Sequence, residues 1–341
     1  MLAEPGSITD VDGVAVGHHQ RTGRGWRTGT TMVLAPHGAV AGVDVRGGGP
    51  GTRETDALAP WNLIEYVNAI CLTGGSAYGL RAADGAMAYL AARDLGYRVG
   101  PEPGQVVPVV PTAVIFDLGR GGNFANHPDA SFGERACSAA THHQHRRGSI
   151  GAGTGAMAGG LRGGVGMASC RVTLAATDAT PPTTVTVGAL CVVNARGSLI
   201  DLATGKPHLS VPGLRRPSLA DRTALADYIA QRAVPSLNTT IGVIATDAAL
   251  TRPEATRLAM SGHDGLARAI DPVHTLADGD TLFAMSTRRT DIGDIDRVGR
   301  LSQIQSAAAR CVARACVDAI LAATPAVNAE SYGSLCPSAL R

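Results

Sequence analysis

The junction of Asn238 and Thr239 is the feature of this sequence that most constrains its fold. It stands between residues 221–233, whose pattern predicts a helix, and the apolar run Ile241–Ala245, which predicts a buried strand. A small polar residue followed by Thr at the start of a strand is what a self-cleaving hydrolase requires. The Thr239 hydroxyl can attack the Asn238 carbonyl, and water can hydrolyse the resulting ester. Thr239 would then carry a nucleophilic hydroxyl and a free amine as its base. The alternative is a polar turn before a core strand.

Other stretches that bear on the family of this chain are spread over its whole length. The junction segment Asn238–Asp247 and the later segment Asp278–Thr287 belong to this set, and the others are Ile8–Gly17, Leu72–Leu80, Gly151–Ala156 and Val187–Asn194. Together and in this order they resemble the DmpA- and BapA-type aminopeptidases of the P1 or S58 peptidase family, which also contains the nylon-oligomer hydrolase NylC. The resemblance is specific for the family and not for a substrate. It implies an α+β fold of the N-terminal-nucleophile kind, a four-layer αββα sandwich like that of DmpA and the ornithine acetyltransferases.

Composition excludes several classes of function. The chain of 341 residues is long enough for one large domain or two small ones. A net charge of +2 provides no basic surface, so we expect no nucleic-acid partner. No apolar run approaches the roughly 20 residues of a membrane span, and the N-terminus lacks the pattern of a signal peptide. The seven cysteines form no CxxC pair and predict reduced thiols, so we expect a cytoplasmic protein that does not bind membranes.

The order of the predicted elements indicates stacked layers of helix and sheet. Short strands come first, and strands that alternate with long helices follow. We expect one domain over residues 1–341, cleaved between residues 238 and 239 into an α chain, 1–238, and a β chain, 239–341. The later predicted elements are helices 78–95, 253–269 (capped by Thr251) and 302–323, and a strand 281–286. Small residues along the last helix permit close packing on a sheet or on a partner subunit.

Two acids follow the junction at a spacing that suits orientation of the nucleophile. Asp278 and Asp280 stand at i and i+2, so in an extended segment both carboxylates share one face. They can orient the amine and hydroxyl of Thr239 through charge-assisted hydrogen bonds. The alternative is a surface turn before a strand. In the family resemblance, this Asp-Gly-Asp falls where the NylC-like branch has its acidic pair and the DmpA and BapA branch has Ser-Gly-Glu, so the chain sides with the NylC-like branch.

Three further residues are candidates for the site. Asn194 ends an apolar strand and matches the Val-Val-Asn segment of the family, which implies an amide that donates to the oxyanion or holds the nucleophile. The basic residue that NylC-like members place after Gly-Thr-Gly-Ala is missing at the equivalent spot, where Gly159 and Gly160 stand, and Arg162 is a nearby substitute. Tyr78 is either a pocket-lining residue or a packed core residue.

Two patterns suggest bound cofactors, and neither fits one. Residues 74–76, Gly-Gly-Ser, lie between a predicted strand and a helix as in a phosphate cradle, but neither GxGxxG nor a GK[ST] ending is present. His127, His142, His143 and His145 suggest a metal, but no acidic or Cys ligand stands at helical spacing, which favours a solvated helix face. We therefore expect neither a metal nor a cofactor.

The sequence as a whole predicts a self-processing hydrolase with an N-terminal threonine. We expect it to cleave amide bonds, as an aminopeptidase or amidase acting on small peptides or amino-acid amides. Two alternatives stay open: acyl transfer of the ornithine-acetyltransferase type, and a catalytically silent oligomeric scaffold. The resemblance also implies a homo-oligomer of αβ units, a tetramer or an octamer.

Overall fold

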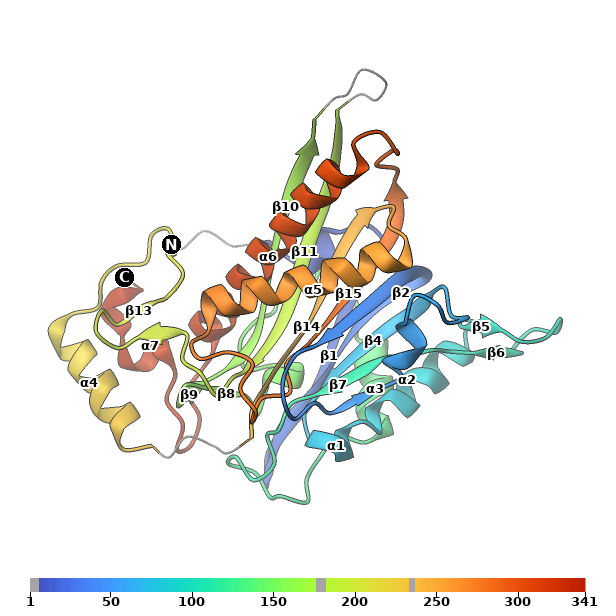
Figure 1. Cartoon of the computed structure of the whole chain (residues 1–341). Helices are drawn as coiled ribbons and strands as arrows, with labels where there is room; N and C mark the ends of the chain where they lie inside the picture. The colour runs from blue at the N-terminus through green and yellow to red at the C-terminus, as the bar shows by residue number, and fades with distance from the viewer. Residues whose placement is uncertain (1–5, 176–181, 233–236, 341) are drawn as a thin grey trace.

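Two β-sheets stacked face to face form the centre of the molecule, and helices cover their outer faces (Figure 1). The computed structural model describes residues 6–175, 182–232 and 237–340. The sheets share one long strand, β2 (Trp26–Val45), whose register shifts near its middle and which thereby passes from one sheet into the other. The predicted α+β sandwich with four layers is confirmed.

The first sheet contains the N-terminal half of β2. β1 and β4 pair with β2 in antiparallel fashion, β7 runs parallel to β4, and β3 closes the edge. Helices α2 (Ala82–Ala91) and α3 (Ala130–Ser138) pack on its outer face through small residues such as Ala83 and Ala136. The strands are β1 (Ala15–Gly23), β3 (Thr52–Arg53), β4 (Val67–Thr73) and β7 (Thr112–Val114).

The second sheet, in the order β10-β11-β14-β15-β2, carries the junction. Its neighbours are antiparallel except β14 and β15, which are parallel because α5 (Arg252–Ala269) connects them as a crossover. Thr251 caps α5 as predicted, in a capping box with Glu254. Helix α6 (Arg297–Ala322) lies beside α5 on the same outer face. The strands are β10 (Gly164–Leu174), β11 (Thr183–Asn194), β14 (Thr239–Ala248) and β15 (Thr281–Thr290).

The space between the sheets is filled by apolar side chains from both of them. Val33 and Ile70 of the first sheet and Val243 and Phe283 of the second are fully buried there. The run Ile241–Ala245 inside β14 is apolar because helices cover the other face of this sheet as well. Core packing on both faces therefore holds the part of β14 that directly follows Thr239 and Thr240.

Small residues on α6 allow it to lie directly on β10. Ala307–Ala309, Ala313 and Ala315 are all buried. A Cβ atom on Gly166 of β10 would lie 2.0 Å from the Ala315 carbonyl oxygen, so only glycine permits this approach. Of the two alternatives for this helix face, the structure shows packing on a sheet, and the face is not available to a partner subunit.

The histidine-rich segment after α3 is an exposed loop and not the expected helix face. Helix α3 ends at Ser138, and His142, His143 and His145 follow it in irregular structure. No group of three or more His, Cys, Asp or Glu side chains within the described ranges is arranged to hold a metal ion. Over the same ranges, no helix is both long and apolar enough to cross a membrane.

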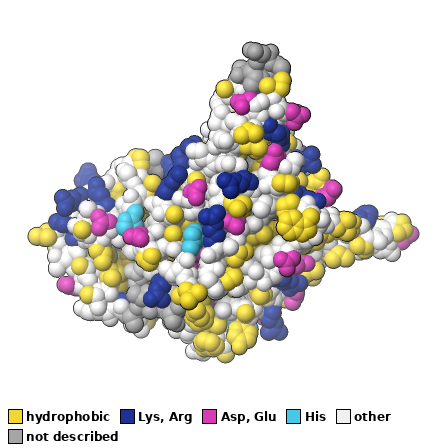
Figure 2. Space-filling model, viewed as in Figure 1, with side chains coloured by type: hydrophobic (Ala, Val, Ile, Leu, Met, Phe, Trp, Pro, Cys, Tyr) yellow, Lys and Arg dark blue, Asp and Glu magenta, His cyan; other side chains and the backbone are white. Residues whose placement is uncertain are grey.

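The remaining elements are short and lie around the sandwich. The predicted helix 78–95 is interrupted and forms α1 and α2, and the hairpin β5–β6 projects from the body (Figure 1). Basic and acidic side chains are interspersed over the face shown in Figure 2. These elements are α1 (Ser76–Gly79), β5 (Tyr97–Arg98), β6 (Val106–Val107), β8 (Met157–Ala158), β9 (Leu161–Arg162), β12 (Ile200–Asp201), β13 (Lys206–Pro207), α4 (Leu219–Ala230), α7 (Tyr332–Leu335) and the 3-10 turns Ile8–Asp10, Asp56–Leu58, Gly151–Gly153 and Pro337–Ala339.

Candidate active site

Thr239 is the first residue of β14, at the edge of the sheet where the two parallel strands begin. Asn238 and Thr239 are buried, with 2% and 4% of their surface exposed. The pairing of β14 with β15 extends one bridge further back, between Asn238 and Asp278, and the Asn238 N–H donates to the Ala277 carbonyl oxygen at 3.0 Å. The segment that precedes β15 is thus brought against the junction, as the sequence predicted for Asp278 and Asp280.

The carbonyl oxygen of Asn238 receives two hydrogen bonds. The Thr239 hydroxyl donates to it, and the Gly279 N–H donates to it at 3.1 Å. A Cβ atom on Gly279 would lie 2.9 Å from Thr239 Oγ1 and 2.6 Å from the Gly49 carbonyl oxygen. Residue 279 therefore supplies a backbone donor at a place where only glycine fits. A donor aimed at a carbonyl oxygen stabilises the negative charge that develops there during nucleophilic attack.

Asp280 joins the junction to a pair of histidines, the half-buried His274 and the buried His263. Its Oδ1 accepts from the Thr240 N–H at 2.6 Å, and its Oδ2 accepts from His274 Nδ1 at 2.8 Å and from the His274 N–H at 3.2 Å. The His274 ring lies edge-on to His263, with 4.9 Å between centroids, and His263 Nε2 donates to the Asp44 carbonyl oxygen. Burial lowers the pKa of His263 to about 4, so this ring is neutral at physiological pH.

Asp278 is fully buried and bonds to a different set of groups. Its Oδ1 accepts from the Arg196 N–H at 3.1 Å. Its Oδ2 accepts from the Thr275 N–H at 3.1 Å and from the Thr275 hydroxyl. Asp278 therefore stabilises the turn that presents Gly279, while Asp280 contacts the backbone of the residue that follows Thr239. The two acids meet the junction together, and they have separate partners.

Asn194 is the direct neighbour of Thr239 across the β11–β14 pair. Its Oδ1 accepts from Met157 N at 3.0 Å and from Arg120 Nη1 at 2.7 Å, and its Nδ2 donates to the Phe116 carbonyl oxygen at 3.3 Å. Its amide nitrogen is thus engaged with Phe116 and not with the Asn238 carbonyl oxygen. The structure places Asn194 beside Thr239, where it holds neighbouring segments in place.

Arg120 is a site residue that sequence reasoning missed. Its guanidinium donates to Asn194 Oδ1, to the Leu237 carbonyl oxygen and, at 3.2 Å, to Asn238 Oδ1. Burial lowers its pKa to about 10, which leaves it charged at neutral pH. Arg120 lies in a Gly-rich loop without periodicity, and its contacts span more than a hundred positions. No signal in the sequence points to it.

Arg162 and Tyr78 lie away from the Thr239 hydroxyl. Arg162 is buried and donates to the carbonyl oxygens of Thr154 at 2.6 Å and Ala156 at 3.2 Å. The cation that contacts Asn194 is therefore Arg120 and not Arg162. Tyr78 is 55% exposed and stacks on His127, with 5.0 Å between ring centroids, so it is not a core residue.

A small cavity opens directly onto the junction. Its volume is about 120 Å³, and Leu237, Asn238 and Thr239 form one wall. The other walls come from residues 49–51, Ser76, Ala77, Val114, Phe116 and Ala277, none of which is charged. Tyr78 is not among them, although its neighbours in α1 are. An uncharged space beside a buried hydroxyl and a backbone donor suits the acyl or amine part of a small amide.

The chain is similar to known proteins over most of its length. The model of peptidase family S58 matches residues 6–332. An uncharacterized aminopeptidase of Mycobacterium leprae (strain TN) is 43% identical over 364 residues, covering 99% of this chain and 96% of that protein. A 6-aminohexanoate-oligomer endohydrolase of Kocuria sp. (strain KY2) is 32% identical over 327 residues, covering 92% of this chain and 84% of that protein.

A solved structure supports the fold. The structure of an L-aminopeptidase D-Ala-esterase/amidase from Ochrobactrum anthropi is described as a prototype for the serine aminopeptidases and as a new variant among the N-terminal-nucleophile hydrolase fold. It superposes with a TM-score of 0.68 at 22% identity, over 95% of this chain and 88% of that chain. At this identity the likeness establishes the shared fold.

Proposed function

The chain belongs to peptidase family S58 and is a hydrolase of the aminopeptidase and amidase kind, and we propose that it matures by cutting itself between Asn238 and Thr239. One observation carries the proposal. The Thr239 hydroxyl donates a hydrogen bond to the Asn238 carbonyl oxygen, and the Gly279 N–H donates a second hydrogen bond to the same oxygen. Nucleophile, electrophile and oxyanion donor are thus already together before any cut.

The maturation reaction follows from these positions. Thr239 Oγ forms a bond to the Asn238 carbonyl carbon, and the Gly279 N–H stabilises the charge on the oxygen. The bond from that carbon to the Thr239 nitrogen then breaks, and the hydroxyl proton ends on the released amine. Water hydrolyses the resulting ester, which leaves a carboxylate on Asn238 and restores the hydroxyl. The products are chains of residues 1–238 and 239–341, with Thr239 at the new N-terminus.

The mature enzyme would use the same atoms on an external amide. The free Thr239 amine, with an unperturbed pKa of about 7.7 to 8.0, takes the proton from the hydroxyl. Asp280, bonded one residue away at Thr240 N, orients this N-terminus, and Asp278 holds the turn that presents Gly279. The substrates of the proposal are small peptides or amino-acid amides. The Kocuria relative is a 6-aminohexanoate-oligomer endohydrolase, which adds oligomers of 6-aminohexanoate as a class to test.

A homo-oligomer of αβ units is part of the proposal. The projecting hairpin supports it, because Tyr97, Val99 and Val107 expose 40%, 61% and 47% of their surface there. In Figure 2 this projection is covered largely by hydrophobic side chains. Apolar side chains gathered on an arm of a monomer mark a contact surface. Light scattering at micromolar concentration should give a mass several times 34.7 kDa, and a 35 kDa species would contradict assembly.

The proposed compartment is the cytoplasm. All seven cysteines are free, including Cys170 and Cys311, whose sulfur atoms lie 3.5 Å apart. Two thiols this close stay reduced in the reducing cytoplasm and would tend to form a disulfide in an oxidising compartment.

The experiment that tests the hydrolase against its alternatives is amide turnover by the purified, matured protein. Butyryl p-nitroanilide and alanine p-nitroanilide should release nitroaniline in buffer without any amine acceptor, and Thr239→Ala should abolish this. Turnover that appears only when an acceptor such as ornithine is added would favour acyl transfer. Full-length protein with no turnover of either kind would favour a silent scaffold.

A further inference from the structure

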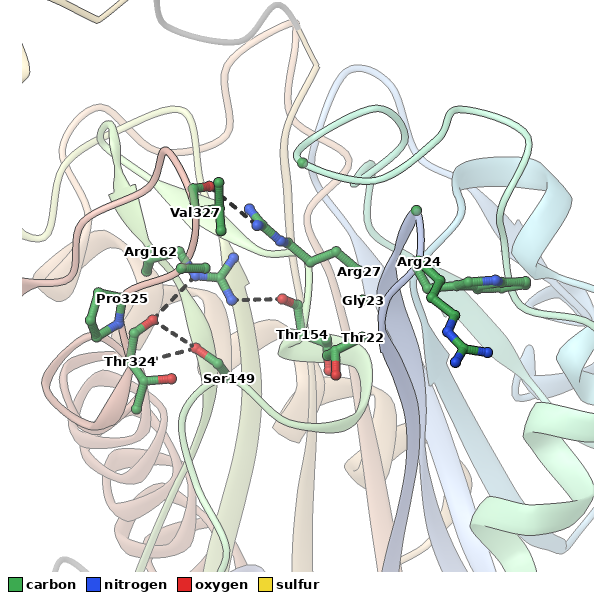
Figure 3. Close-up of a pocket in the computed structure, with 14 residues that line it drawn as sticks. Thr22, Gly23, Arg24, Arg27, Ser149, Thr154, Arg162, Thr324, Pro325 and Val327 are labelled. Carbon is green, nitrogen blue, oxygen red and sulfur yellow. Dashed lines mark hydrogen bonds between the residues drawn. The ribbon is translucent and has the colours of Figure 1, made fainter.

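A second cavity next to the junction is lined by arginines. Its volume is about 420 Å³, and its wall includes Arg27, Arg120 and Arg232. A neighbouring cavity of about 510 Å³ shares Arg27 and Val327 with it and adds Arg162 (Figure 3). Figure 3 shows the side chains of Arg27 and Arg162 approaching one another near Val327, on the opposite side of the cavity from Arg24. Four arginines, Arg27, Arg120, Arg162 and Arg232, therefore line two adjoining cavities that share a wall.

The hydrogen-bond acceptors of these arginines are uncharged. Arg27 donates to the Val327 carbonyl oxygen at 3.2 Å, and Arg162 donates to three backbone carbonyls. Arg232 donates to a backbone carbonyl of Asn328, and Arg120 donates to two amide side chains and a backbone carbonyl. Among the residues that the structure describes, none of the four has a carboxylate within the 4.0 Å of an ion pair.

The charge of this region is unbalanced. Burial lowers the pKa of both Arg120 and Arg162 to about 10, and the positive charge of Arg27 adds to the effect on Arg162. The carboxylate whose charge acts on these two is Asp117. Burial raises the pKa of Asp117 to about 6, so its carboxylate carries one negative charge at neutral pH and becomes protonated as the pH falls below 6. Buried charges in proteins are normally paired, so the excess of guanidinium groups calls for an anion.

Arg120 connects this cavity to the acyl side of the scissile bond. It donates to Asn238 Oδ1 and to the Leu237 carbonyl oxygen, both on the carbonyl side of the cut. An external amide is attacked by the same hydroxyl with the same Gly279 donor, so its acyl group takes the place of Asn238. The far end of that acyl group then reaches Arg120 and the space behind it.

We propose that the arginine-lined cavity binds a carboxylate carried by the acyl group of the substrate. This proposal rests on the proposed function and selects within it: the preferred substrates are amides of acyl groups that end in a carboxylate. The guanidinium group suits this role, since it binds a carboxylate through two parallel hydrogen bonds.

A binding experiment tests the proposal without depending on catalysis. The uncut Thr239→Ala chain is titrated by calorimetry with glutarate and with glutaramide, its uncharged analogue of equal size. Glutarate should bind at least tenfold more tightly. In the same background Arg27→Gln should lower the affinity for glutarate roughly tenfold, as expected for the loss of one charge-assisted hydrogen bond. Arg27→Lys should lower this affinity by a smaller factor. Arg93→Gln, at an exposed arginine stacked on Tyr89, is the matched control and should change nothing.

Equal binding of the two compounds would overturn the proposal, as would glutarate binding that Arg27→Gln leaves unchanged. Thermal melting of each variant shows whether it is folded. If Arg27→Gln does not fold, Arg232→Gln takes its place with the same expected loss.

Turnover distinguishes a substrate carboxylate from the carboxylate that maturation creates on Asn238 itself. The mature enzyme is given p-nitroanilides of two acyl groups of matched length: glutaryl and its uncharged primary amide. We expect kcat/KM to be at least tenfold lower for the uncharged acyl group, with the difference residing in KM. Equal rates for the two, together with glutarate binding to the uncut chain, would assign the cavity to the Asn238 carboxylate and refute the substrate role. Failure to hydrolyse even the uncharged amide refutes the proposed function, and the calorimetry still decides the cavity.

Discussion

Replacing Asp280 by Asn should slow self-cleavage by roughly two orders of magnitude or more. The Asp280 carboxylate accepts three hydrogen bonds, from Thr240 N at 2.6 Å and from His274 Nδ1 and N at 2.8 and 3.2 Å. An Asn side chain keeps its oxygen for Thr240 and turns its NH₂ group toward the two donors of His274. Two hydrogen bonds to a charged acceptor are lost, each worth about 1.5–3 kcal/mol. If about 3 kcal/mol of this acts on the transition state, the rate falls by about 10²-fold.

The assay is the rate at which freshly translated or refolded chain splits on a denaturing gel. Asp278→Asn is the matched comparison. The Asn side-chain oxygen can still accept from Arg196 N, and the Asn NH₂ group can donate to the Thr275 hydroxyl, which donates to Asp278 in the wild type. We expect a smaller slowing there, together with a lower melting temperature. Circular dichroism confirms that both variants fold. A near-wild-type rate for Asp280→Asn would refute the reasoning and reduce the acid pair to a structural turn.

Three more predictions follow from the geometry. Gly279→Ala should cleave itself at least tenfold more slowly, because the added Cβ would lie 2.6 Å from the Gly49 carbonyl oxygen and must shift the turn that presents the Gly279 N–H; an equal rate on the gel, from a variant that circular dichroism shows to be folded, would contradict the role of this N–H. Burial raises the Asp117 pKa to about 6, so ionisation of Asp117 destabilises the folded wild-type protein as pH rises. The free energy of unfolding of Asp117→Asn, measured in urea, should therefore increase relative to that of wild type by roughly 2–3 kcal/mol between pH 4 and pH 8. A difference in unfolding free energy that does not change with pH would contradict this prediction. The kcat/KM of the mature enzyme should rise with pH through the pKa of the Thr239 amine, whose unperturbed value is about 7.7 to 8.0, and a flat profile from pH 5 to 9 with chemistry limiting would exclude the amine as base.

The parts of the site that the sequence could predict are local. Asn238-Thr239 before a buried run identified the start of β14. Asp278 and Asp280 were expected to face Thr239 because the i and i+2 side chains of an extended segment share one face, and the structure brings their segment against the junction. The Thr251 cap of α5 was likewise readable, since a capping box involves residues three positions apart. The four-layer sandwich came from family resemblance, because periodicity does not determine how two sheets stack.

The parts that could not be predicted depend on contacts between distant segments. Arg120 reaches Asn238 from a loop with no periodic pattern, and His274 gives no sign in the sequence of its bond to Asp280. Arg162 was expected near the site because of its place after the Gly-Thr-Gly-Ala segment, but β9 turns its guanidinium onto backbone carbonyls of the preceding loop. The exposed histidines were expected on a helix, and α3 ends before them because no apolar periodicity continues past Ser138.

The central claim is that Thr239 cuts the chain at its own N-terminal side. The most direct measurement is the intact mass of the purified protein, together with N-terminal sequencing of its smaller component. Cleavage gives chains of 238 and 103 residues, roughly 24 and 11 kDa by proportion, and the smaller one should begin Thr-Thr-Ile-Gly-Val. Thr239→Ala should remain a single chain of 34.7 kDa. A wild-type chain that stays whole on long incubation, or a Thr239→Ala chain that splits at the same bond, would contradict the account.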